Sequence, residues 1–155
     1  MNTLRQLIAG GLMAFTGIAA AQDAAPVNVG DKLPTNVRVL LIQEMQAVLT
    51  ATQTILEGIV KGQHELVAEK AQGIHDSFIL KQKMTPEDRK ALMAAVPDDF
   101  VQRDRAFHEL SADLVESAQS ADQARERVLF GKMVEACVGC HSRYADGRFA
   151  GLKAE

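Results

Sequence analysis

The chain has 155 residues, of which 47% are hydrophobic and 24% are charged, and its formal net charge is -3. This length suffices for one domain with a single buried core. The mild acidity disfavours nucleic acid as a partner, because phosphate binding depends on clustered Lys and Arg.

Residues 1–21 have the features of an export signal. Arg5 precedes an almost unbroken run of apolar and small residues over 7–20, and Ala19–Ala21 match a small-residue cleavage site. The apolar run is short for a bilayer crossing, which needs about 20 residues, so a retained membrane anchor is the less favoured alternative. We expect this signal peptide to be removed, which takes Arg5 away, moves the formal charge from -3 to -4 and leaves no membrane association.

Residues 22–34 are small and polar, with Pro26 and Gly30 as breakers, and predict an extended leader. Helices are expected almost throughout the rest of the chain, since strand-like alternation is absent. A first long helix is predicted over 35–61 and ends at Gly62. Its apolar residues recur at steps of three and four and predict one buried stripe: Leu41, Met45, Val48, Thr52, Ile55 and Ile59. A second helix is predicted over 63–83.

Thr85, Pro86 and the two acids that follow form a helix start signal for a short connecting helix, which Pro97 ends. A third long helix follows Asp98. Ser120 and Gln123 predict the capping box of a fourth. Its predicted inner stripe is Phe130, Met133, Val134, Cys137, Cys140 and His141. Four amphipathic helices with short links predict an all-α antiparallel four-helix bundle over 35–146, followed by an irregular tail over 147–155.

The sharpest motif is Cys137-Val138-Gly139-Cys140-His141, which has the form of a c-type haem attachment site. The two thiols can add across the vinyl groups of one haem, and the adjacent imidazole can bind its iron. A thiol redox site is the alternative for a CxxC pair in an exported chain. A zinc site is disfavoured, because the sequence has no second cluster of Cys and His.

The motif falls on the fourth helix, where Cys137 and His141 lie one turn apart on one face with Cys140 beside them. Both sulfur atoms and the iron ligand can therefore meet one flat macrocycle. The expected cofactor is one covalent haem c, with His141 as the proximal iron ligand.

The sequence resembles the cytochrome c′ family, the class II c-type cytochromes. The resemblance rests on an export signal, four predicted helices and a CxxCH motif close to the C-terminus, and it covers essentially all of the mature chain. It implies a periplasmic protein that is not an enzyme, exchanges electrons with a redox partner protein and can form a homodimer through its first two long helices.

Helix geometry ranks the residues that can lie opposite His141. At 1.5 Å per residue, His141 lies about 30 Å from the turn that joins the first two helices, Leu41 about 30 Å and Met45 about 24 Å. His64 lies at that turn and is expected to be solvated. Met45 is the favoured distal iron ligand, because a thioether suits haem iron, and Leu41 is a candidate for the distal pocket.

Two functions follow from these two residues. With His141 and Met45 on the iron, the protein is an electron carrier with both axial positions filled. The alternative, which some members of the resembled family illustrate, is a five-coordinate haem that binds nitric oxide or carbon monoxide below a bulky apolar residue. A basic stretch (Lys81, Lys83, Arg89 and Lys90) is expected to be a solvated face, with the docking of an acidic redox partner as the alternative.

Overall fold

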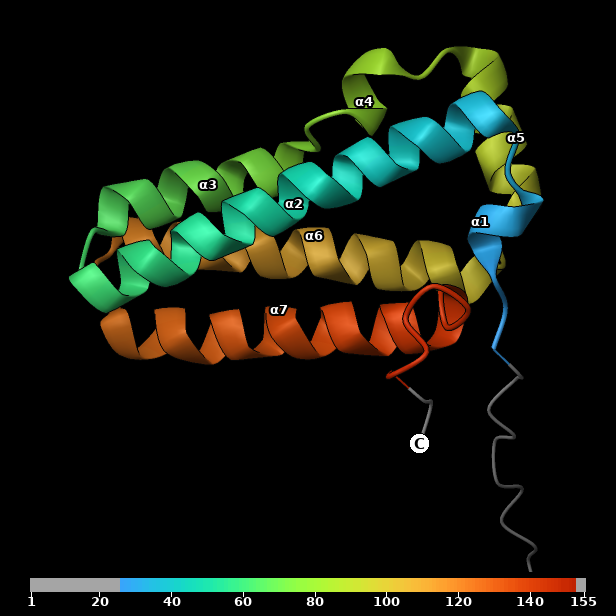
Figure 1. Cartoon of the computed structure of the whole chain (residues 1–155). Coiled ribbons are helices and arrows are strands. Elements are labelled where there is room, and N and C mark those ends of the chain that lie inside the picture. Colours follow the sequence, from blue (N-terminus) through green and yellow to red (C-terminus); the bar gives the residue numbers. More distant parts are fainter. Residues whose placement is uncertain (1–25, 153–155) are drawn as a thin grey trace, which may run out of the picture.

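The computed structural model describes residues 26–152, and this part of the chain is helical without strands. Four helices form the bundle: α2 (Thr35–Lys61), α3 (His64–Asp76), α6 (Asp98–Gln119) and α7 (Gln123–Tyr144). Three shorter helices are α1 (Val29–Lys32), α4 (Leu80–Lys83) and α5 (Pro86–Ala95). The antiparallel arrangement is visible in Figure 1, and the expected all-α four-helix bundle is confirmed. The predicted signal peptide lies outside the described residues.

The helices are unequally close to one another. α3 packs extensively against α6, as α2 does against α3 and α6 against α7, whereas α2 and α7 touch only sparsely. Figure 1 shows α2 diverging from α7 toward the end of the bundle where α7 finishes and α1 and α5 lie. The bundle is therefore narrow at the α2–α3 turn and wide at the other end.

A dense apolar core fills the narrow end. Its centre consists of side chains with little or no exposed surface, contributed by all four helices: Ala51, Ile55, Val67, Ala71, Ile74, Leu114, Val115, Ala118, Leu129 and Met133. Gly62 ends α2 in a left-handed conformation, with φ of 67°, which glycine adopts without steric cost. The sequence prediction of this helix end is confirmed.

The buried face of α2 is rotated from the predicted stripe. Val48 and Ile55 are buried as expected, but Met45 is 39% exposed, and Glu44 is buried instead. The burial of Glu44 is not expected from the sequence, because a carboxylate is rarely buried without a partner.

Glu44 also explains why the predicted second helix is broken. Its carboxylate accepts hydrogen bonds from three consecutive backbone N–H groups, those of Phe78 (3.1 Å), Ile79 (2.5 Å) and Leu80 (3.0 Å). The Ser77 hydroxyl donates a fourth bond of 3.0 Å. Because these amides bind a side chain of α2, α3 ends at Asp76, and the single predicted helix over 63–83 is wrong.

Two smaller corrections concern the other connections. The predicted extended leader contains α1, and both Val29 and Leu33 are buried in a second apolar cluster near the end of α7. Asp122, rather than Ser120, caps α7, since its carboxylate accepts from the Arg125 N–H at 3.0 Å. The Thr85 cap and Pro86 start of α5 are confirmed, with Asp88 completing a capping box.

α2 carries a second apolar face that points away from the core. Leu49, Leu56 and Val60 are exposed along it. Within residues 26–152, α2 alone is long and apolar enough to cross a membrane by length and composition, and 22% of its most apolar window is buried. A helix that packs on the core with one face and exposes apolar residues on another has the same composition.

Candidate haem site

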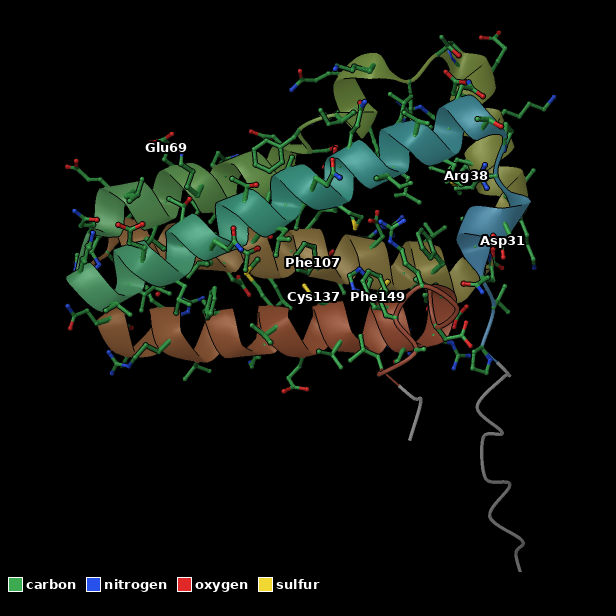
Figure 2. All side chains as sticks on the ribbon, viewed as in Figure 1. Asp31, Arg38, Glu69, Phe107, Cys137 and Phe149 are labelled. Carbon is green, nitrogen blue, oxygen red and sulfur yellow. The ribbon has the colours of Figure 1, made fainter. Side chains whose placement is uncertain are left out.

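The two cysteines and His141 lie on the inward side of α7, near its C-terminal end. Cys137, Cys140 and His141 are all half-buried, and both thiols are free. Figure 2 shows Cys137 on the side of α7 that faces the other helices, with Phe149 beside the C-terminal part of the same helix. The structure thus brings the three predicted attachment residues together on one helix face.

The cysteines are poorly suited to disulfide chemistry. Burial raises the pKa of the Cys137 thiol. Burial, with a smaller contribution from the charge of Asp104, raises the pKa of the Cys140 thiol to about 11. Redox-active CxxC pairs depend on a lowered thiol pKa, so this environment argues against the thiol redox alternative.

The imidazole of His141 is half-buried and stacks on an aromatic ring. Its ring stacks on the Phe149 ring at a centroid distance of 4.6 Å, with 11° between the planes. Burial lowers the pKa of His141, which favours the neutral imidazole that binds a metal. Phe149 belongs to the predicted irregular tail, which forms turns from Ala145 onward.

The side chains that surround this face are less deeply buried than those at the narrow end. Leu41, Phe100 and Cys140 pack as half-buried residues against the second apolar cluster, whose buried members are Val29, Leu33, Val37 and Tyr144. Asp104 lies on the same side of α6 as Phe100, Phe107 and the fully buried Ser111, at helical spacing, yet 55% of its side chain is exposed. An inward-facing residue with that exposure indicates that protein side chains do not fill the wide end of the bundle.

A cation at this end lacks a protein partner. Arg38 is half-buried on α2, one turn before Leu41, and forms no ion pair within the described part of the chain (Figure 2). A half-buried guanidinium is stabilised by an anion. One of the two carboxylates that a haem carries would supply that anion. The residues present therefore fit a haem in three respects: the cation for a carboxylate, the apolar side chains around the macrocycle and the cysteines that would attach it.

The other three histidines of the chain lie away from this face. His64 is not the solvated residue that was expected, because its Nδ1 lies 2.6 Å from the buried carboxylate of Glu126. His75 and His108 pair reciprocally, each Nδ1–H donating to the backbone carbonyl of the other, at 3.0 and 3.1 Å. These three histidines therefore serve contacts between helices.

Cys137 and Cys140 supply the two free thiols that thioether attachment of a haem requires. Each thiol would add across one vinyl double bond of the haem, so that a sulfur–carbon bond would form and the thiol hydrogen would pass to the neighbouring carbon. Cys137 and Cys140 would hold the macrocycle against α7, and His141 would face its iron. Fold and site together define a c-type cytochrome built on a four-helix bundle.

The comparisons with known proteins give the family. The profile of the family described as Cytochrome C' matches residues 39–145, which is most of the chain. The chain belongs to the cytochrome c′ family. Neither the curated proteins nor the solved structures give a significant match. The protein is accordingly a haem c-binding electron-transfer protein and not an enzyme, with one covalent haem attached through the cysteine pair of its C-terminal helix.

Several residues around the haem face are not among those that the sequence predicts for the site: Arg38, Glu44, Asp104 and Phe149. A signal existed for Asp104, which follows Phe100 by four positions and precedes Phe107 by three on an otherwise apolar stripe. No local pattern marks Phe149, because only the folded tail brings it to His141.

Proposed function

We propose that this protein is a five-coordinate cytochrome c′ in which His141 binds the iron and Leu41 lies over the opposite, open face. Such a site combines electron transfer with reversible binding of nitric oxide or carbon monoxide. His/Met ligation, which the sequence favoured, has less support than this alternative.

The observation that carries the proposal is the difference between Leu41 and Met45. Leu41 is half-buried and packs against the same apolar cluster as Cys140, whereas Met45, one turn further along α2, is 39% exposed. An iron ligand must be held toward the metal, and an exposed, flexible thioether is not. A branched apolar side chain offers no donor atom, so it shields the iron without binding it.

The chain's own residues define what the site does. A bound haem supplies an iron that accepts and donates one electron and can take a diatomic ligand. Phe149 fixes the ring of His141, and the two cysteines fix the macrocycle relative to that ring. Leu41 and Phe100 supply apolar surface at this end of the bundle, against which a macrocycle would pack.

Members of the family are typically periplasmic, and the apolar segment over residues 7–20 supports export of this chain as well. We propose that its redox partner is a second exported protein. We also propose that the exposed apolar face of α2 (Leu49, Leu56 and Val60) packs against a second copy. Sedimentation equilibrium tests the homodimer: Leu56→Glu should give a monomer of unchanged colour, and a monomeric unmodified protein would contradict it.

The kinetics of carbon monoxide binding test the function. The reduced protein should bind carbon monoxide, and Leu41→Ala should accelerate binding about tenfold, which corresponds to about 1.4 kcal/mol of barrier. Met45→Ala is the matched control on the same helix and should leave the rate nearly unchanged. A reduced protein that binds no carbon monoxide until Met45 is replaced would overturn the proposal.

A further inference from the structure

The outer face of α5 combines apolar and cationic side chains around a depression. Pro86, Arg89, Lys90 and Met93 follow one another at helical spacing, so they share one face. With Met84 they line an open pocket of about 410 Å³. The opposite face of α5 packs inward through Ala91, Leu92 and Ala95.

The pocket has the composition of a transient protein interface. Met84, Pro86 and Met93 form its apolar lining, of which Met93 is 52% exposed, and methionine adapts its shape to different partners. Arginine and methionine are both enriched in protein–protein contacts. Arg89 and Lys90 form no ion pair in the described residues, and Lys81 and Lys83 of the preceding α4 are likewise exposed and unpaired.

The charge of this region runs against that of the whole chain. The protein is acidic, with a net charge of -3, whereas four cations lie on α4 and α5. The two acids at the start of α5 do not line the pocket, and Asp88 is occupied by the cap of the helix and by Asn36. The four cations and two acids of α4 and α5 leave these helices with a net charge of +2, so a partner that approaches this region meets a locally positive surface.

The pocket also lies close to the haem face. The inner side of α5 packs against the same apolar cluster as Cys140 and Leu41, so one helix separates the pocket from that cluster. The diameter of a helix with its side chains is about 10–12 Å. Figure 1 shows α5 at the wide end of the bundle, beside α1 and the N-terminal part of α2.

We propose that the pocket lined by Met84, Pro86, Arg89, Lys90 and Met93, with Lys81 and Lys83 on the preceding α4, is the docking site for an electron-transfer protein with an acidic face. The proposal rests on the proposed function and adds the chemistry of the partner to it. The cations would attract and orient the acidic face, and the apolar lining residues would hold it while an electron passes between the two centres.

Stopped-flow oxidation of the reduced, haem-loaded protein tests the proposal with two anionic oxidants. One is ferricyanide, and the other is oxidised plant plastocyanin, a blue-copper protein with an acidic face. Arg89→Glu/Lys90→Glu should slow both reactions about tenfold at low ionic strength, and salt should remove the difference. The matched control is Arg127→Glu/Lys132→Glu, which makes the same change in net charge on exposed, unpaired residues of α7 and should slow both reactions far less.

A third variant separates docking from simple attraction of anions. Met93→Ala should slow oxidation by plastocyanin about threefold and leave the ferricyanide rate unchanged, since only a protein partner is expected to bury the apolar lining residues. Equal rates for the α5 and α7 charge variants would overturn the proposal. So would binding to phosphatidylglycerol vesicles that Arg89→Glu/Lys90→Glu abolishes, because the patch would then serve a membrane surface. A colourless protein would instead refute the proposed function, so the two failures are distinguishable.

Discussion

The two ends of the bundle are built by the same four helices but from different chemistry. At the narrow end, Ile55, Ile74 and Leu114 meet with no exposed surface, as in the core of any stable helical protein. At the wide end, the corresponding inward positions carry Cys137, Cys140 and Asp104, and these side chains stay partly exposed. The narrow end therefore holds the helices together, and this stability allows the wide end to keep the spacing that a cofactor needs.

Replacing the attachment residues, which lie at the wide end, should have the largest effect of these substitutions. Cys137→Ala/Cys140→Ala should abolish covalent haem binding completely, because no other cysteine exists in the chain. In mass spectrometry, the exported variant should lack the added mass of one haem. In far-ultraviolet circular dichroism, it should keep the helical signal. Val138→Ala, between the two cysteines, is the control, and a retained haem mass in the double variant would contradict the assignment.

Leucine truncations at the two ends should differ in stability. Leu114→Ala should lower the free energy of unfolding by about 3 kcal/mol, because it opens a cavity in a fully packed core. Leu41→Ala should cost about 1 kcal/mol, since the side chain is only half-buried. Urea unfolding of the haem-loaded proteins measures both values, and equal losses would show that the two ends are packed alike.

Glu44 ties the wide end to the α3–α4 connection, so its removal should affect both stability and the site. Glu44→Ala leaves three partly buried N–H groups without an acceptor and should cost about 2 kcal/mol. Glu44→Gln keeps one oxygen acceptor and should cost less. Hydrogen exchange at residues 78–80 should rise in both variants, and unchanged protection of these amides would contradict the role of the carboxylate.

The smallest effect is expected at the start of α5, far from the dense core. Hydrogen bonds from the side chain and the backbone of Thr85 lower the pKa of Asp88 below its usual value of 3.8. A carboxyl group whose folded-state pKa is lowered stabilises the protein above its unfolded pKa and loses that contribution as the pH falls through the folded value. Asp88→Asn should therefore reduce the loss of stability that acid causes below about pH 4. The visible spectrum of the haem should stay unchanged. Thermal unfolding at stepped pH values measures this. A variant whose stability falls with pH in parallel with that of the unmodified protein would contradict it.

The sequence predicted the helices and the attachment motif well, because both have local signals. Apolar spacing marked the α2 helix, Gly62 its end and Pro86 the start of α5. The break at Ser77 was missed because its cause, Glu44, lies 33 residues earlier in the chain.

Within the site, local spacing placed Cys137, Cys140 and His141 on one face, but it could not decide between Leu41 and Met45. These two residues are 40° apart around α2, and only the packing of α2 against its neighbours decides which is covered. The stacking of Phe149 on His141 depends in the same way on how the tail folds back, which no periodic pattern encodes.

The spin state of the iron in the unmodified protein tests the central claim most directly. Electron paramagnetic resonance of the oxidised protein, together with its visible spectrum, should show high-spin iron, and Met45→Ala should leave both spectra unchanged. A low-spin iron with a weak band at the red end of the spectrum, lost in Met45→Ala, would contradict an open face beside Leu41.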